Sequence, residues 1–134
     1  MKVIRQATQM DYIHIVRAIQ NKHISFITPA HIKEDIKNNR QYVLEENNHI
    51  IGIISLVYDT TYKYYAIKRL CILNKKNNGK GYGKMLLSYL ATLPLNNIGC
   101  TPWNDNYKMK HLLETLGFKL QYIFDEKWCF YLKR

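Results

Sequence analysis

Hydrophobic and polar residues alternate at the start of the chain and then change to a helical spacing. The alternation over residues 2–7 predicts a short strand. Thr8 is a residue type that caps helices and Asp11 suits a first helical turn, so a helix is expected over residues 9–20. The chain therefore begins with a strand that leads directly into a helix.

A second helix is predicted shortly after the first. Pro29 suits the first turn of a helix, because N–H groups there have no acceptor within the helix and the missing N–H of proline costs no hydrogen bond. Ile32 and Ile36 are spaced so that they share one helical face. The helix is expected to end at Asn38 or Asn39.

The middle and the end of the chain carry the patterns of strands. Residues 41–59 predict two strands joined by a tight turn at Asn47 and Asn48. Residues 62–73 are rich in aromatic and apolar side chains and predict a further strand. Three more strands are expected over residues 97–101, 118–125 and 127–133, the last two as a hairpin.

Two more helices are predicted between these strands. Apolar side chains with helical spacing follow residue 81, at Tyr82, Met85, Leu86, Tyr89, Leu90 and Leu93. Pro94 is expected to stop this helix. The other helix is expected within residues 104–116, with Asn104 or Asp105 near its cap and Gly117 as its C-terminal stop.

This order of elements indicates a mixed sheet flanked by helices. The 134 residues are enough for one core, so we expect a single domain over residues 1–134. No apolar run is long enough to cross a bilayer, and the first residues lack the apolar stretch of a signal peptide. A cytoplasmic location is therefore expected.

The formal net charge of +10 favours an anionic ligand. Lysine outnumbers arginine and forms no long run, so the charge alone does not indicate nucleic acid. The three cysteines show no paired spacing, which predicts free thiols, and Cys71 fits the apolar alternation of its strand better than a nucleophile. The histidines lack the spacing of metal ligands, so no metal site is predicted.

Three alternating glycines, Gly79, Gly81 and Gly83, immediately precede a predicted helix. The segment fits neither a P-loop, because Met85 follows Gly83-Lys84 where Ser or Thr is required, nor a dinucleotide fingerprint, because the third glycine is missing. What remains is a turn whose bare N–H groups lie at the positive end of a helix. This turn predicts a phosphate site, to which the nearby lysines add positive charge. That interpretation is favoured over a turn that only caps the helix.

The segment Asn78-Gly79-Lys80-Gly81-Tyr82-Gly83 resembles the acetyl-CoA signature Q/R-x-x-G-x-G/A of the GNAT superfamily of N-acetyltransferases. Residues 3–11 and 104–118 are similar to the opening and the late helix of that family. The resemblance implies an α/β (α+β) fold. Its sheet would be mixed and mostly antiparallel, with about seven strands flanked by about four helices.

The resemblance also implies the cofactor site. Acetyl-CoA would act as co-substrate, with its pyrophosphate on the glycine loop and its pantetheine arm beside the preceding strand, where a backbone N–H would stabilise the thioester oxygen. The expected cofactor-binding residues are Ile72, Leu73, Asn78, Gly79, Lys80, Gly81, Tyr82, Gly83, Lys84 and Asn106.

Two family residues are missing from the pattern. Leu113 stands where many relatives carry a tyrosine that protonates the thiolate, and residues 62–73 lack the carboxylate that serves others as a base. Three explanations remain open: direct attack by a neutral amine, substitution by Tyr107 or His111, or binding of acetyl-CoA without turnover.

The resemblance implies an amine acceptor, and Phe26 and Trp103 are the candidate contacts to it. Aromatic residues of this kind more often belong to the hydrophobic core, which is the alternative interpretation. Because acidic residues are few and scattered, a small amine or a peptide amine is favoured over a strong polycation. A nucleic-acid or transfer-RNA directed protein and a non-catalytic acetyl-CoA sensor are the rival hypotheses. The protein is expected to act without a membrane, as a monomer or a homodimer.

Overall fold

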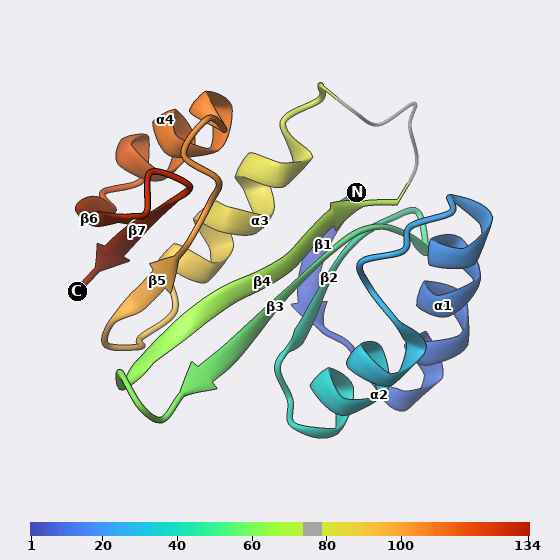
Figure 1. Ribbon diagram of the computed structural model, residues 1–134. Coiled ribbons are helices and arrows are strands. Elements are labelled where there is room, and N and C mark those ends of the chain that lie inside the picture. Colours follow the sequence, from blue (N-terminus) through green and yellow to red (C-terminus); the bar gives the residue numbers. More distant parts are fainter. Residues whose placement is uncertain (74–78) are drawn as a thin grey trace.

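The structure is a computed structural model that describes residues 1–73 and 79–134. Seven strands form one sheet in the order β1-β2-β3-β4-β5-β7-β6. The sheet is antiparallel except for the pairing of β4 with β5. Helices α1 and α2 cover one face and α3 and α4 the other (Figure 1). This confirms the predicted mixed, mostly antiparallel sheet flanked by four helices.

The first half of the chain follows the predicted elements closely. Its elements are β1 (Lys2–Gln6), a 3-10 turn (Gln9–Asp11), α1 (Tyr12–Asn21), α2 (Pro29–Lys37), β2 (Gln41–Glu46), β3 (His49–Asp59) and β4 (Tyr64–Ile72). The predicted first helix is divided, because the Asp11 carboxylate accepts from the Thr8 N–H at 2.7 Å and tightens the first turn. The Asn47–Asn48 turn has φ values of 51° and 67°, which fits the predicted tight hairpin.

The second half also has its expected elements, which are α3 (Tyr82–Ala91), β5 (Ile98–Cys100), α4 (Tyr107–Thr115), β6 (Lys119–Phe124) and β7 (Trp128–Lys133). The cap of α4 lies later than Asn104 or Asp105, because the Asn106 side chain accepts from the Met109 N–H at 3.2 Å. Gly117 follows α4 with φ of 92°, a left-handed conformation that suits a helix stop. Among the helices of residues 1–73 and 79–134, none is long and apolar enough to cross a membrane.

Two hydrophobic clusters lie on opposite faces of the sheet. One joins the sheet to α3 and α4 and includes Leu86 and Leu113, both fully buried. The other lies beneath α1 and α2 and includes Ile15 and Ile32. Since β2 and β3 contribute buried residues to both clusters, these two central strands are covered on both faces.

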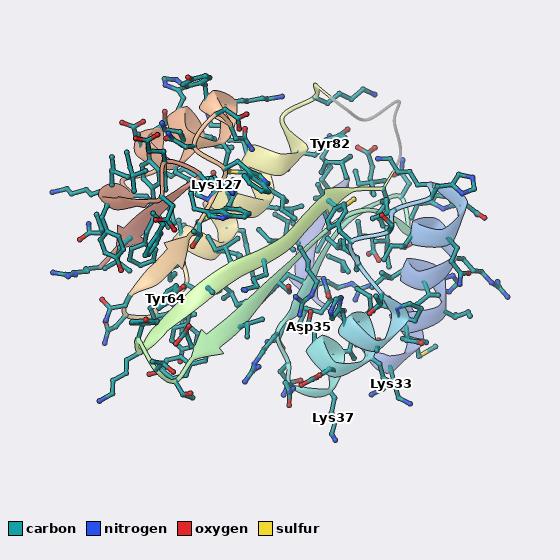
Figure 2. The ribbon with its side chains drawn as sticks, viewed as in Figure 1. Lys33, Asp35, Lys37, Tyr64, Tyr82 and Lys127 are labelled. Atoms are coloured by element: carbon teal, nitrogen blue, oxygen red, sulfur yellow. The ribbon has the colours of Figure 1, made fainter. Side chains whose placement is uncertain are left out.

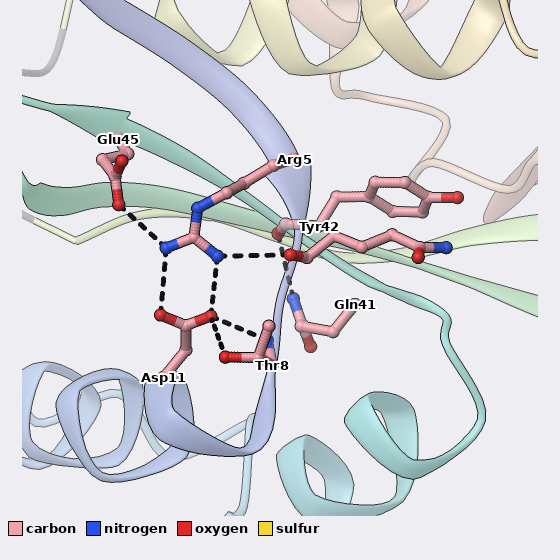
Figure 3. A network of polar contacts seen from close by, with 7 residues as sticks. Arg5, Thr8, Asp11, Gln41, Tyr42 and Glu45 are labelled. Atoms are coloured by element: carbon pink, nitrogen blue, oxygen red, sulfur yellow. Dashed lines mark hydrogen bonds and ion pairs between the residues drawn. The ribbon is translucent and has the colours of Figure 1, made fainter.

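Ion pairs fix the helices of one face to the strands. The Arg5 guanidinium donates to both carboxylate oxygens of Asp11, at 2.8 and 3.0 Å, and to Glu45 at 2.8 Å (Figure 3). Arg69 likewise donates two hydrogen bonds to Asp35, whose side chain is 3% exposed. Arg69 has φ of 52° at an irregularity of the β3–β4 pairing, so this pair holds α2 to a distorted point of β4.

Candidate functional site

The pairing of β4 with β5 is short. In the described chain the two strands pair only at Tyr65–Ile98 and Ala66–Gly99. Beyond these pairs β4 continues to Ile72, whereas β5 ends at Cys100 (Figure 1). The two parallel strands therefore separate toward the end of β4.

A cavity of about 640 Å³ lies at this separation, and we call it the glycine pocket. It is formed by the end of β4, the glycine turn, the start of α3 and the start of α4. The lining residues are Leu70, Cys71, Ile72, Gly79, Gly81, Tyr82, Gly83, Lys84, Asn106, Lys108, Met109 and Leu112. Four segments that are far apart in the sequence thus meet at one site.

The glycine turn exposes its backbone to the pocket. Gly79 and Gly81 have φ values of 78° and 79°, which L side chains rarely adopt, and a Cβ at either position would have open space within 4 Å. Gly81 is also the N-cap of α3, and its carbonyl accepts from the Met85 N–H at 3.0 Å. The first N–H groups of α3 have no acceptor within the helix, so the positive end of this helix could receive an anion.

The structure brings most of the predicted cofactor residues together. Those that line the glycine pocket are Ile72, Gly79, Gly81, Tyr82, Gly83, Lys84 and Asn106. Lys80 is exposed on the turn beside the pocket and is not part of its lining. Asn78 lies outside the described residues.

The pairing with β3 distinguishes Ile72 from Leu73. Leu73 is 8% exposed and its N–H donates to the Ile51 carbonyl at 2.9 Å, so this N–H serves the sheet rather than the pocket. Because successive backbone groups of an antiparallel strand alternate in direction, those of Ile72 are directed to the opposite edge, toward the pocket. Of the two residues predicted to contact the cofactor through their backbone, Ile72 therefore has an N–H free of the sheet and Leu73 does not, since a register difference of one residue reverses the direction.

The candidate proton-transfer residues lie away from the glycine pocket. Tyr107 is 74% exposed and has the Lys110 ammonium 5.4 Å from its ring centre. His111 is exposed on the outer side of α4. Leu113, at the family's tyrosine position, is fully buried in the core. The structure therefore assigns proton transfer to neither Tyr107 nor His111.

The two expected acceptor contacts are likewise outside the pocket. Trp103 stacks on Trp128 with ring centres 3.8 Å apart and lines a separate cavity of about 360 Å³ together with Tyr107. Phe26 is 64% exposed in the segment between α1 and α2. Both residues are expected on the acceptor side, which the family resemblance places opposite the cofactor, and their role as acceptor contacts stays a prediction.

Several lining residues were missed from the sequence. Lys108, Met109 and Leu112 have helical spacing on one side of α4, so its periodicity could have indicated them. Cys71 also lines the pocket, and it is half-buried. Burial raises the pKa of the Cys71 thiol, which keeps it protonated and a weak nucleophile near neutral pH.

A further cavity of about 500 Å³ lies at the other end of β4, and we call it the aromatic cavity. Its lining includes Tyr64, Tyr122, Phe124 and Phe130. The Tyr64 and Phe130 rings are in edge contact, with centres 5.2 Å apart. Tyr64 and Ile72 are the two ends of β4, about 26 Å apart at 3.3 Å per residue, so the two cavities are distinct.

The chemistry of the glycine pocket has two parts. At one end the N–H groups of α3, with Lys84 and Lys108, favour a phosphate group. At the other end the side chains of Leu70, Ile72 and Leu112 offer an apolar wall beside the unpaired edge of β4. A ligand with a phosphate group and an uncharged arm that pairs with a strand fits both parts.

Residues 7–118 match the family model of the acetyltransferase (GNAT) family. The chain belongs to this family, and it is an N-acetyltransferase. Members of the family generally take the acetyl group from acetyl-CoA. No curated protein sequence matches the chain.

Solved structures of acetyltransferases share the fold. A GNAT family acetyltransferase from Bacillus cereus aligns with 21% identity and a TM-score of 0.80, over 100% of this chain and 97% of the other. One from Streptococcus pneumoniae has 16% identity and a TM-score of 0.77, over 99% and 98%. A spermidine N-acetyltransferase chimera from Vibrio cholerae has 16% identity and a TM-score of 0.69, over 98% of this chain and 93% of the other.

Proposed function

We propose that the glycine pocket binds acetyl-CoA and that the enzyme transfers the acetyl group to a primary amine of a small molecule or a peptide. The main support for this function is that an open β4 edge, a glycine turn and the N-termini of α3 and α4 all meet at one cavity. Each contributes one recognition element: backbone pairing, space for close approach, and positive potential.

The backbone of this chain performs the positioning. The N–H groups at the start of α3 would hold the pyrophosphate, with Lys84 adding a full charge. The Ile72 backbone would pair with the arm and direct a donor to the thioester oxygen. Gly81 fits this role, since a side chain there would project into the space that the phosphates need.

The proton chemistry follows from the described lining. These residues include no carboxylate and no histidine, and Leu113 lies in the core. We therefore propose direct attack by a neutral amine held against the thioester in a ternary complex, with the released proton passing to water. The rate should rise with pH until the acceptor amine is fully deprotonated.

The charge of the chain favours acceptors that are not strongly cationic. One relative of the same fold is a spermidine acetyltransferase. The net charge of +10 here would repel a polyamine over a long range. We therefore expect monoamines and peptide amines to react better than spermidine, and nucleic acid is not expected to be the partner.

Release of CoA thiol from acetyl-CoA across a panel of amines tests this function. The panel should contain monoamines, peptides with a free amino terminus and spermidine, each measured at several pH values. We expect amine-dependent release that is greatest for the monoamines or peptides. Binding of acetyl-CoA without release for any amine would contradict the proposal and support a sensor.

A further inference from the structure

One lysine side chain already reaches the strand edge that forms the glycine pocket. Lys22 is the C-cap of α1, and its Nζ donates to the carbonyl oxygen of Ile72. Ile72 belongs to the lining of the pocket. The Lys22 amine therefore contacts the backbone of a residue that lines the cavity.

Neighbouring groups lie on both sides of the contact between Lys22 and the Ile72 carbonyl. The Lys22 N–H donates to the Ala18 carbonyl at 3.1 Å, which fixes the backbone at the end of α1. The Cys71 thiol lies 3.7 Å from the same Ile72 oxygen. The C-terminal ends of α1 and β4 lie at the same end of the molecule (Figure 1). Lys22 is thus half-buried and lies next to Ile72 of the pocket lining.

We propose that Lys22 is an internal acetyl acceptor, so that the enzyme acetylates its own chain at this residue. The inference rests on the proposed binding of acetyl-CoA in the glycine pocket. Lys22 supplies the functional group of the proposed acceptors, a primary amine, beside the backbone at which the thioester would lie. Attachment to the fold makes the reaction intramolecular, which raises the effective concentration of the amine.

The atoms of the step balance without another reactant. The Lys22 ammonium first gives one proton to water. The neutral Nζ then attacks the acetyl carbonyl carbon, an N–C bond forms and the C–S bond breaks. The nitrogen loses a second proton, and the departing thiolate takes up a proton to give the free thiol. The products are Nε-acetyl-lysine and CoA.

Other lysines differ from Lys22 in position. Lys84 and Lys108 line the pocket at the starts of α3 and α4, which is the end that would hold phosphate. Lys33 and Lys37 are exposed and project from α2 into solvent (Figure 2). They provide an internal standard for chemical acetylation of ordinary surface lysines.

Peptide mass spectrometry of the full chain during incubation with acetyl-CoA, in the absence of other amines, tests the proposal. The fraction acetylated at Lys22 is compared with that at Lys33 and Lys37. We expect Lys22 to react more than about tenfold faster, at a rate independent of protein concentration, because a held amine reacts as a unimolecular step. Lys33→Arg should leave this rate unchanged.

Two variants complete the test. Gly81→Asp should reduce acetylation of Lys22 to the rate of the exposed lysines by excluding the cofactor. Lys22→Arg should bind acetyl-CoA as the wild type does and lose only the preferred modification. Equal rates at Lys22 and Lys33, or a Lys22 rate unchanged by Gly81→Asp, would overturn the proposal.

Calorimetry on the same preparations distinguishes failure of the internal acceptor from failure of the proposed function. Acetyl-CoA binding without preferred acetylation of Lys22 overturns the internal acceptor and leaves the proposed function intact. Absence of acetyl-CoA binding overturns both.

Discussion

The first four strands of the sheet and the last three are covered differently. Val43 and Leu44 are adjacent residues of β2 that face opposite sides, and both are fully buried because helices cover each face. All six residues of β6 are exposed, including Leu120 and Ile123. The first half is therefore a three-layer core, and the second half is a sheet with one covered side.

The site lies where these two halves meet. The glycine pocket opens where β4, the last strand of the first half, separates from β5. A rigid strand and a helix N-terminus hold one side of the pocket, and α4 of the second half closes the other. The difference suggests that the first half sets the stability, while the second half shapes the ligand sites.

Truncation of one leucine in each half tests this division most strongly. Leu44→Ala removes a fully buried side chain from β2 in the first half and should lower the free energy of unfolding by about 2–5 kcal/mol. Leu120→Ala removes a side chain that is 46% exposed and should change it by less than about 0.5 kcal/mol. Urea unfolding of both variants gives the values, and equal losses would refute the comparison.

Removal of Asp35 tests the ion pair that joins α2 to β4. Asp35→Ala leaves the Arg69 guanidinium, 18% exposed, without its carboxylate and should cost about 3 kcal/mol. The double variant Asp35→Ala/Arg69→Met should recover part of this loss, because no unpaired charge remains. Glu46→Ala breaks the solvent-exposed pair with Lys2 and is the control. A loss no greater than that of the control would contradict a structural role for the buried pair.

Gly99→Ala tests the packing of the second half. A Cβ at Gly99 would lie 2.7 Å from a ring carbon of Tyr64 and 3.0 Å from one of Phe130. The rings must shift, so we expect a destabilisation of about 1–3 kcal/mol in thermal or urea unfolding. The same substitution should cost less in a Tyr64→Leu background, and an equal cost in both backgrounds would exclude the ring contact as the cause.

The smallest predicted effect depends on pH. The hydrogen bonds from Arg5 hold the pKa of Asp11 below its ordinary 3.8. The ionised Asp11 therefore stabilises the fold above that value, and its contribution is lost as the pH falls through the lowered folded-state pKa. Between about pH 6 and about pH 2, wild type should lose more stability than Asp11→Asn. Parallel losses in the two proteins would rule out this linkage.

Much of the fold could be predicted because its signals are local. The Asn47–Asn48 turn and the Gly117 stop each need only a few residues and a left-handed backbone. The pairing of Asp35 with Arg69 could not be found in this way, because the residues are 34 positions apart and the contact depends on an irregularity in β4.

The candidate site shows the same limit. The glycine turn carries its own signal, since alternating glycines before a helix indicate exposed backbone. Whether the backbone groups of Ile72 or those of Leu73 are directed toward the pocket depends on the register of β4 with β3. Spacing within one strand does not determine this register. The approach of Lys22 to Ile72 spans 50 positions and requires the packed position of α1.

Titration of acetyl-CoA into wild type, Gly81→Asn and Gly81→Asp, followed by calorimetry, tests the central claim most directly. Asn and Asp are similar in size, and both tolerate the left-handed backbone of this position. The account predicts that wild type binds, that the Asn variant binds more weakly, and that the Asp variant loses a further factor of more than about 100 through charge repulsion. Equal binding by Asn and Asp variants, or no binding by wild type, would contradict the assignment of the glycine pocket.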